Sequence, residues 1–298
     1  MNDLMGCGDG SVLYIQSKCY IMKESKLFLS VSGLTVTVFN IILLWVLSCP
    51  SVAAQTVYLD TLVEIRGCEV YISAQRKVME DKDHSIPVLM AIHGNGREAL
   101  NYFPWGEKSI PFYVYQRDIA VDNGYLFIVA SIGQETWGTD RGLELLKDVY
   151  KYIHETYKAD KKWTLWGTSA GGLHMWRLIR LYPERIAKAI GTFPVYDLAS
   201  AFEKRKSERF VWQDSAEFAD INPSSFPNQL TSVPILIFHG RDDKAVSHRS
   251  HSLRLLNEVN ELGGQVELVI VDGGHSTSNW AIYQKDKIID FLGHSQQK

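Results

Sequence analysis

One serine of this chain stands in a context that could make it a nucleophile. Ser169 lies at the centre of a G-x-S-x-G pattern that follows an apolar segment and precedes a stretch with helical periodicity. This pattern places the serine on a strained turn between a strand and a helix, with its hydroxyl raised above the edge of a sheet. The start of the helix then crosses close to the strand, so the neighbouring positions must be small. They hold Gly167, Ala170, Gly171 and Gly172.

Two further segments could activate the Ser169 hydroxyl. A serine needs a base to remove its proton and an acid that holds this base in the right tautomer. His275 follows two glycines at the end of a predicted strand, and these allow the loop to turn back toward the serine. Asp243 fits the pattern H-G-x-x-D-x-x-V after another predicted strand, with Asp242 as the alternative acid. We therefore predict a Ser169–Asp243–His275 triad, and a structural role in the turn for His239.

Other histidines are weaker candidates for the base. His248 and His251 follow the acid closely and stand before the last predicted strand, at the start of a helix. The chain order serine, acid, histidine is the one that accompanies a nucleophile on this kind of turn. His275 is the histidine that satisfies this order at the end of a strand.

A glycine-rich loop could supply part of an oxyanion hole. The run His93-Gly94-Asn95-Gly96 follows the first long apolar strand, where such enzymes place a backbone amide near the substrate carbonyl. We expect the amides of Asn95 and Ala170 to bind the oxyanion that forms during acyl transfer. In the alternative interpretation, His93 caps a strand and the next residues form an ordinary turn.

Aromatic residues near these loops could shape a substrate pocket. The candidates are Phe103, Trp105, Trp137, Trp212 and Trp280. An aromatic-lined cleft would suit esters of phenolic acids or of aromatic alcohols. Because aromatic side chains dominate protein cores, each of them is individually more often a packing residue.

These loops need a sheet to bring them together. Apolar runs typical of strands buried on both faces recur along the chain and alternate with helical periods. The predicted strands are Val57–Ile65, Glu69–Ile72, Pro87–Ile92, Leu126–Ala130, Trp163–Trp166, Pro234–Phe238 and Val266–Val271, the first two joined as a hairpin at Arg66-Gly67. This alternation predicts an α/β fold with a mostly parallel central sheet flanked by helices, in one catalytic domain over residues 55–298.

Helical periods lie between the strands. One runs through Leu146, Val149 and Ile153, and we expect Asp140 to cap it. The other predicted helices are Leu173–Tyr182, which ends before Pro183, Leu255–Leu262, which stops at Gly263-Gly264, and a closing helix over Trp280–Phe291. Residues 197–231 depart from the alternation with a charged cluster and two turn-forming X-Pro pairs. A segment of this length is either a short lid insertion or a solvated surface excursion.

The N-terminal segment resembles an export signal. An uncharged stretch of 22 residues, Leu27–Ser48, follows Lys18, Lys23 and Lys26 and precedes small residues ending at Ala54. A basic start, an apolar centre and a small-residue exit are typical of a cleaved secretory signal, here over residues 1–54. Such cleavage would leave Gln55 first, with Cys68 as the one remaining cysteine.

Two alternatives remain for this segment. The apolar stretch is long enough to span a bilayer as an uncleaved anchor over residues 27–48. The residues before Cys49 also resemble a bacterial lipobox, in which that cysteine would carry a lipid. All three interpretations place the folded part outside the cytosol, as a secreted or membrane-anchored protein.

Composition excludes several classes of protein. The chain has 298 residues, of which 46% are hydrophobic and 22% charged, and this balance excludes a disordered chain or a coiled coil. Its formal net charge is −3 and it has no basic run, so nucleic acid is a poor candidate for a partner. The expected partner is a small ester or a short peptide substrate.

The motifs together resemble those of the α/β-hydrolase superfamily, from about Val57 to the C-terminus. Within it, the chain is similar to secreted feruloyl-esterase and polyhydroxybutyrate-depolymerase-like enzymes, and to the catalytic domain of the prolyl oligopeptidase and dienelactone-hydrolase-like group. The resemblance implies a serine hydrolase that forms an acyl-enzyme and uses no metal or organic cofactor. A carboxylic ester is the expected substrate, a short peptide the alternative, and a binding protein on the same scaffold a third possibility.

Overall fold

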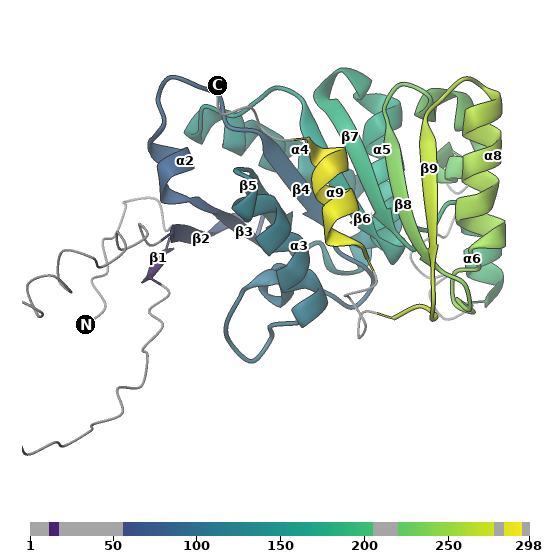
Figure 1. Cartoon of the computed structure of the whole chain (residues 1–298), viewed down its shortest axis with the longest axis horizontal. Coiled ribbons are helices and arrows are strands. Elements are labelled where there is room, and N and C mark those ends of the chain that lie inside the picture. Colours follow the sequence, from purple (N-terminus) through teal and green to yellow (C-terminus); the bar gives the residue numbers. More distant parts are fainter. Residues whose placement is uncertain (1–11, 18–55, 205–219, 277–282, 294–298) are drawn as a thin grey trace, which may run out of the picture.

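The strands form one twisted, mixed sheet (Figure 1). The computed structural model describes residues 12–17, 56–204, 220–276 and 283–293. In this part of the chain the sheet has nine strands in the order β1-β2-β3-β5-β4-β6-β7-β8-β9. Their bounds are β1 Val12–Ser17, β2 Val57–Ile65, β3 Cys68–Gln75, β4 Val88–Ile92, β5 Leu126–Ala130, β6 Trp163–Thr168, β7 Ile186–Thr192, β8 Ile235–Gly240 and β9 Val266–Val271. The pairs from β5 to β9 are parallel, whereas β1, β2 and β3 join antiparallel.

The predicted hairpin forms the antiparallel end of this sheet. Ile65 of β2 pairs with Cys68 of β3, so Arg66 and Gly67 make a two-residue turn. Both turn residues have positive φ, 53° and 73°, as the turn that best matches strand twist requires. The hairpin prediction is confirmed, and β3 continues to Gln75, three residues beyond its expected end.

One strand was not predicted. β7 lies between β6 and β8 and follows α5 after a single short turn. Its apolar pattern is interrupted by Lys188, which hides the strand in the sequence. The Lys188 ammonium donates to the backbone carbonyls of Phe291 and Leu292, both at 2.7 Å. These carbonyls at the C-terminal end of α9 compensate the Lys188 charge. Because α9 lies far from β7 in the sequence, the residues around Lys188 do not predict this contact.

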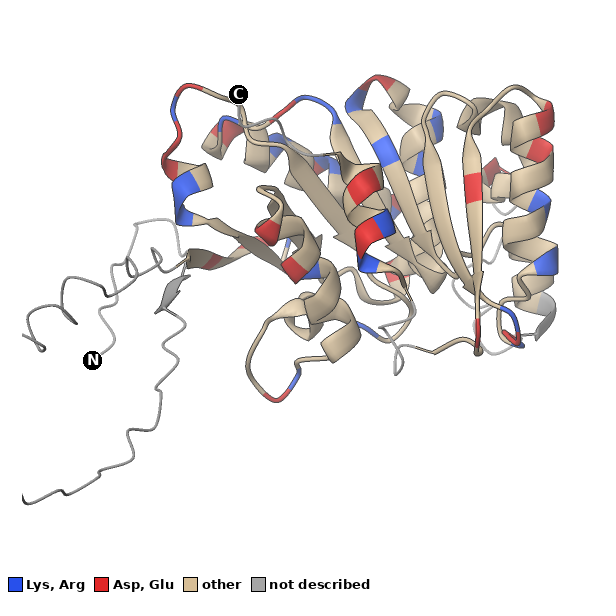
Figure 2. Cartoon of the chain, viewed as in Figure 1, with Lys and Arg blue, Asp and Glu red and all other residues tan. Residues whose placement is uncertain are grey.

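Helices cover both faces of the sheet. The described helices are α2 Arg76–Glu80, α3 Pro111–Asp122, α4 Asp140–Thr156, α5 Gly172–Leu181, α6 Leu198–Lys204, α8 Arg254–Glu261 and α9 Lys285–Leu292. α3 and α9 lie on one face, in front in Figure 1, whereas α4, α5 and α8 pack on the other. Figure 2 shows most charged residues on these helices and on the loops, with few on the strands.

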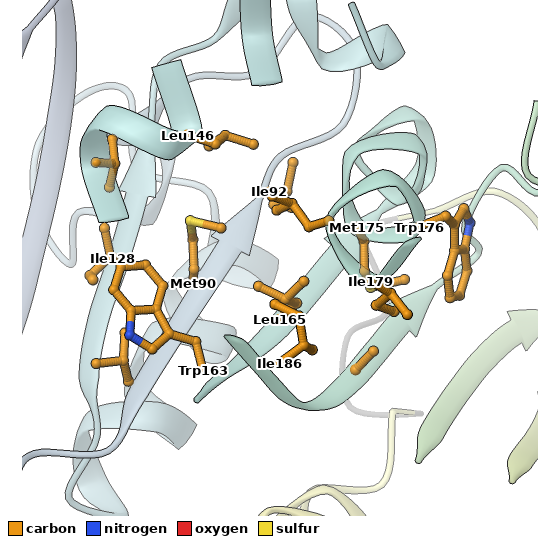
Figure 3. Close-up of a cluster of buried hydrophobic side chains, with 14 of the residues drawn as sticks. Met90, Ile92, Ile128, Leu146, Trp163, Leu165, Met175, Trp176, Ile179 and Ile186 are labelled. Atoms are coloured by element: carbon orange, nitrogen blue, oxygen red, sulfur yellow. The ribbon is translucent and has the colours of Figure 1, made fainter. Parts of the chain in front are cut away.

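Alternate residues of the central strand β4 feed two hydrophobic layers. Met90 and Ile92 point into the layer beneath α4 and α5, with side chains such as Trp163 and Met175 (Figure 3). Leu89 belongs to the opposite layer beneath α3. Burial of each such side chain stabilises the fold by about 1.5–3 kcal/mol, which holds the sheet and its loop ends in place.

The N-cap of α4 and the start of α9 differ from the prediction, whereas α5 and α8 each begin and end within one residue of their predicted bounds. Thr139, and not Asp140, caps α4: its hydroxyl accepts the amide of Gly142 at 3.1 Å, and Asp140 occupies the first turn. The acid there still interacts favourably with the helix dipole, which is why the two positions are hard to separate by sequence. α9 begins at Lys285, later than the expected Trp280, which lies outside the described residues.

The predicted export segment lies almost entirely outside the described residues. Of residues 1–54 the structure describes Val12–Ser17, which pairs antiparallel with β2. The apolar stretch Leu27–Ser48 and Cys49 are not described, so the signal, anchor and lipobox alternatives stay predictions. In the described ranges, no helix combines the length and the apolar character needed to cross a membrane.

The predicted lid segment is described in part. Residues 205–219 lie outside the described ranges, but α6 precedes them and two short 3₁₀ turns, Pro223–Ser225 and Pro227–Leu230, follow. Leu198 and Ala201 of α6 are buried in one cluster with Ala170, the residue after the candidate nucleophile. The segment therefore starts beside the site, although whether it acts as a lid stays a prediction.

Candidate active site

Ser169 occupies a sharp turn between β6 and α5. β6 ends at Thr168, the residues Ser169–Gly171 form a single 3₁₀ turn, and α5 begins at Gly172. Ser169 has φ of +52°, a left-handed conformation that is uncommon for a residue other than glycine. Such strain costs about 1–3 kcal/mol and persists where the surrounding structure enforces it. The backbone thus has the geometry that the sequence pattern predicted.

Glycines make this turn possible because other backbone comes too close for a side chain. A Cβ on Gly171 would collide with the carbonyl oxygens of Ile92 and His93, the latter at 2.6 Å. A Cβ on Gly172 would meet the Cβ of Pro194 at 2.8 Å. The turn is therefore wedged between the ends of β4 and β7, which leaves no room for a larger residue.

The structure brings Ser169, His275 and Asp243 together in a hydrogen-bonded chain. The Oγ of Ser169 lies 2.9 Å from Nε2 of His275, and Nδ1 of His275 lies 2.7 Å from Oδ2 of Asp243. An ionised carboxylate only accepts hydrogen bonds, so Nδ1 carries the proton and Nε2 is free to accept one. The Ser169 hydroxyl then donates to Nε2, as required for removal of its proton.

Asp243 is held as a buried carboxylate. Its side chain is fully buried and Oδ1 accepts the amides of Ala245 and Val246 at 2.9 and 2.8 Å. Burial alone would raise the pKa of Asp243, but hydrogen bonds from His239 and His275 and the charge of His275 hold it well below its usual range. Asp243 is therefore ionised at neutral pH.

His239 also contacts the carboxylate of Asp243. It is fully buried at the end of β8, and its Nε2 lies 3.2 Å from Oδ2 of Asp243 and 2.7 Å from the carbonyl of Val246. Its Nδ1 contacts the hydroxyl of Ser252 at 2.6 Å. The predicted structural role in the turn thus extends to direct contact with the carboxylate.

The alternative residues are placed elsewhere. Asp242 is exposed, and its amide donates to the carbonyl of Gly273 at 2.8 Å. His251 is buried, and its Nδ1 accepts the amides of Tyr196 and Asp197 at 3.1 and 3.0 Å. His248 is half-buried with its ring 6.3 Å from the ring of His239. The structure brings none of these three alternatives into hydrogen-bond contact with Ser169.

The glycine-rich loop lies directly beside Ser169. A Cβ on Gly94 would lie 3.3 Å from the Cβ of Ser169, so these two residues are in close contact. His93 holds the loop to the sheet: Nε2 accepts the amide of Ile132 at 3.1 Å, and Nδ1 donates to the carbonyl of Gly94 at 2.8 Å. Burial lowers the pKa of His93 to about 4, which keeps its ring neutral for this arrangement.

Trp137 connects the loop to the turn that holds Ser169. Its indole N–H donates to Oδ1 of Asn95 at 3.2 Å, and its ring packs in the cluster that contains Ala170. The two residues proposed as oxyanion donors are therefore linked through one side chain. Sequence reasoning proposed Trp137 as a pocket residue, and the structure places it 99% buried behind the loop, since only 1% of its surface is exposed.

The remaining aromatic candidates fall in two groups. Phe103 is buried and packs edge-on against Tyr71, and Trp105 packs edge-on against Phe103 at 4.6 Å. Both belong to the hydrophobic layer beneath α3 or to its margin. Trp212 and Trp280 lie outside the described residues, so their predicted role in a pocket stays a prediction.

Two residues next to His275 were not predicted. The ring of Phe193 lies 4.3 Å from the imidazole, and the hydroxyl of Tyr283 donates to the carbonyl of Ser276 at 2.9 Å. Neither residue belongs to a motif that marks catalysis, and Phe193 comes from a part of the chain more than 80 positions before His275. Only the folded chain shows that they meet there.

Sequence comparison agrees with this geometry. The sequence profile of the prolyl oligopeptidase family matches residues 123–298, which is more than half of the chain and includes all three residues of the hydrogen-bonded chain. No individual curated protein matches the sequence significantly.

Similar solved structures include both esterases and peptidases. S-formylglutathione hydrolase from Staphylococcus aureus aligns with a TM-score of 0.60 and 15% identity, over 79% of this chain and 96% of its own. A ferulic acid esterase aligns with a TM-score of 0.59 and 12% identity, over 79% and 96%. An acylaminoacyl peptidase aligns with a TM-score of 0.63 and 13% identity, over 80% of this chain and 41% of its own. At these identities the likeness establishes the fold, and the predicted α/β-hydrolase fold is confirmed.

Proposed function

Because this chain belongs to the prolyl oligopeptidase family of serine hydrolases, we propose that it cleaves carboxylic esters through an acyl-enzyme on Ser169. The observation that carries the proposal is the hydrogen-bonded chain from Ser169 through His275 to Asp243. Each of its three members comes from a different strand end. Such a chain has the polarity needed to draw a proton from the serine hydroxyl.

In the first step Ser169 attacks the acyl carbon. His275 takes the hydroxyl proton on Nε2 as the new C–O bond forms, and the ring becomes an imidazolium. The ionised Asp243, 2.7 Å from Nδ1, stabilises this positive charge and keeps the ring oriented. The carbonyl oxygen becomes an oxyanion, for which the amides of Asn95 and Ala170 are the proposed donors.

In the second half of the reaction the tetrahedral intermediate collapses. His275 gives its proton to the leaving alkoxide, and the alcohol departs from an ester of Ser169. Water then attacks this acyl-enzyme while His275 again accepts a proton, and the same donors bind the second oxyanion. The acid product leaves and Ser169 regains its proton from His275. In this cycle each proton is transferred through the side chains of Ser169 and His275.

The choice of an ester is supported by two of the similar structures. S-formylglutathione hydrolase and ferulic acid esterase, by their names, act on a thioester and an ester, and both align over 96% of their own length. A short peptide is the second candidate, and the family match supports it. The two candidates share their machinery and differ in the leaving group, an alcohol or an amine.

A substrate panel tests the proposal. We expect turnover of p-nitrophenyl acetate and butyrate, loss of this turnover in Ser169→Ala, and no cleavage of proline or alanine anilides. Turnover of the anilides and not of the esters would favour the peptidase. Unchanged ester turnover in Ser169→Ala would contradict the proposed nucleophile.

We also propose that the catalytic domain is exported after cleavage behind Ala54. The basic, apolar and small-residue segments at the N-terminus support this proposal. Mass spectrometry of the exported protein should show Gln55 as the first residue. An intact N-terminus, or a lipid on Cys49, would support the anchor or the lipobox instead.

A further inference from the structure

Phe193, which lies outside the hydrogen-bonded chain, has a strained backbone. In the described ranges four residues other than glycine have positive φ: Arg66, Ser169, Phe193 and Gln284. Arg66 forms the hairpin turn, Ser169 forms the turn between β6 and α5, and Gln284 precedes the first residue of α9, so local chain direction explains these three. Phe193, with φ of 39°, directly follows the C-terminal end of β7. Strain of this kind gathers at functional sites, and for a bulky aromatic residue it requires a reason.

The segment that carries Phe193 is tied to the nucleophile turn. The amide of Phe193 donates to the carbonyl of Phe238 in β8 at 2.8 Å. Two residues later, the amide of Val195 donates to the carbonyl of Ser169 at 2.9 Å. These bonds fix the backbone on both sides of the strained residue. The direction in which the ring of Phe193 points is therefore enforced by the two strands and by Ser169.

The ring of Phe193 points at the imidazole of His275. The two ring centroids are 4.3 Å apart with the planes tilted by 54°, and only 1% of Phe193 is exposed. On its other sides the ring of Phe193 packs near Phe112 and Tyr283, with ring centroids 6.1 and 6.3 Å apart. Phe193 thus fills the space between the imidazole and the hydrophobic layer.

We propose that Phe193 is a positioning residue that holds the imidazole of His275 in line with Ser169 and Asp243. This inference rests on the proposed function, in which His275 is the base. The ring closes one side of the imidazole, so rotation away from the two hydrogen bonds would meet the ring. Its π-electrons also lie within the distance at which an aromatic ring stabilises a cation, here the imidazolium that forms during the reaction. The strained backbone is the conformation that turns the ring toward His275.

Phe193→Leu tests this role, with Phe112→Leu as the matched control. Both residues are 1% exposed members of the same hydrophobic layer, but the described contacts pair only Phe193 with the imidazole. We expect Phe193→Leu to lower kcat for p-nitrophenyl butyrate about tenfold and to leave KM within about twofold. A loss of about tenfold lies between the effect of an exposed cation–π contact, about two- to fivefold, and that of a desolvated one, about 30-fold. It is smaller than the loss of about 100-fold that a 1 Å misplacement can cause. Phe112→Leu should lose similar stability and keep kcat within about twofold.

Labelling with a fluorophosphonate separates this inference from the proposed function. If wild-type protein is not labelled at Ser169, the proposed function fails. If wild type is labelled and folded Phe193→Leu reacts and turns over like Phe112→Leu, the positioning role alone is refuted. Should the leucine variant not fold, Phe193→Met, unbranched and of similar volume, is measured in the same way. An equal fall in kcat for both positions would also refute the role, because packing alone would explain it.

Discussion

Replacement of Asp243 by asparagine should reverse the polarity of the hydrogen-bonded chain. Oδ1 of Asp243 accepts the amides of Ala245 and Val246 at 2.9 and 2.8 Å, so the carbonyl oxygen of an asparagine would take this position. Its NH₂ group would then face Nδ1 of His275 at 2.7 Å and Nε2 of His239 at 3.2 Å. Both ring nitrogens would meet a donor where the wild-type protein offers an acceptor.

The cost of this change follows from the tautomer of His275. Nδ1 must lose its proton to accept from the asparagine, and the proton then resides on Nε2, which faces Ser169. The ring can no longer accept the hydroxyl proton, and no carboxylate stabilises the imidazolium. Such a substitution lowers kcat about 10⁴-fold where it has this effect, equivalent to about 5.4 kcal/mol at 1.36 kcal/mol per tenfold.

Steady-state hydrolysis of p-nitrophenyl butyrate at pH 7–8 measures this effect. The control is Asp242→Asn, because Asp242 is exposed and contributes its backbone amide to the turn. We expect the control to keep kcat within about twofold. A loss below about tenfold in Asp243→Asn, or a larger loss in the control, would refute the assignment of the acid.

We expect the difference in stability between wild type and Asp243→Asn to depend on pH. The pKa of Asp243 is held below its usual range, so its ionised form stabilises the folded protein fully above the unfolded pKa of about 3.9. This contribution begins to fall near the unfolded pKa and is lost as pH falls through the lower, folded pKa. Urea unfolding should therefore show a stability difference between wild type and Asp243→Asn that is constant from pH 7 to about 5 and shrinks below about 4. A difference that shrinks already between pH 7 and 5 would contradict the depressed pKa.

Three further changes test the surroundings of the nucleophile. Gly171→Ala should destabilise the protein by about 3 kcal/mol in urea unfolding, because the added methyl group would collide with two carbonyl oxygens. The control is Gly274→Ala, where the methyl group would lie 3.5 Å from its nearest neighbour, the carbonyl oxygen of Asp242. It should change the free energy of unfolding by less than about 0.5 kcal/mol. Ser169→Gly should be more stable than Ser169→Ala by about 1 kcal/mol, since glycine adopts the positive φ without strain; equal stabilities would show that the turn is relaxed. Trp137→Phe should lower kcat about three- to tenfold because it loses the hydrogen bond to Asn95, the proposed oxyanion donor. Trp163→Phe should leave kcat unchanged, because the Trp163 indole N–H donates to a backbone carbonyl at the end of β6 far from Ser169. If both tryptophan variants lose activity equally, the loop is not oriented by Trp137.

The positions of the candidate reactive groups could be predicted from the sequence because chemistry restricts their residue types. The turn at Ser169 tolerates only small neighbours, and acid and base must follow strand ends in a fixed order. For this reason Ser169, Asp243 and His275 could be named before the fold was known, and the structure places them within hydrogen-bond distance. The parallel strands were accessible as well, since burial on both faces leaves long apolar runs.

The features that sequence reasoning missed depend on partners far along the chain. β7 carries Lys188 in its centre, and only the carbonyl groups at the end of α9 explain how a strand accommodates it. Phe193 is an apolar residue in an apolar segment, and neither its positive φ nor its contact with His275 leaves a pattern. Thr139 and Asp140 are both good capping residues, so only the hydrogen bond to Gly142 distinguishes them.

Covalent capture of the nucleophile tests the central claim most directly. The protein is treated with a fluorophosphonate, digested, and sequenced by mass spectrometry to locate the phosphonylated residue. The account predicts one adduct, on the Oγ of Ser169. It predicts no adduct on Ser169→Ala, provided that this variant is folded and has the Tm of wild type. An adduct on another residue, or none on wild-type protein that hydrolyses p-nitrophenyl butyrate, would contradict it.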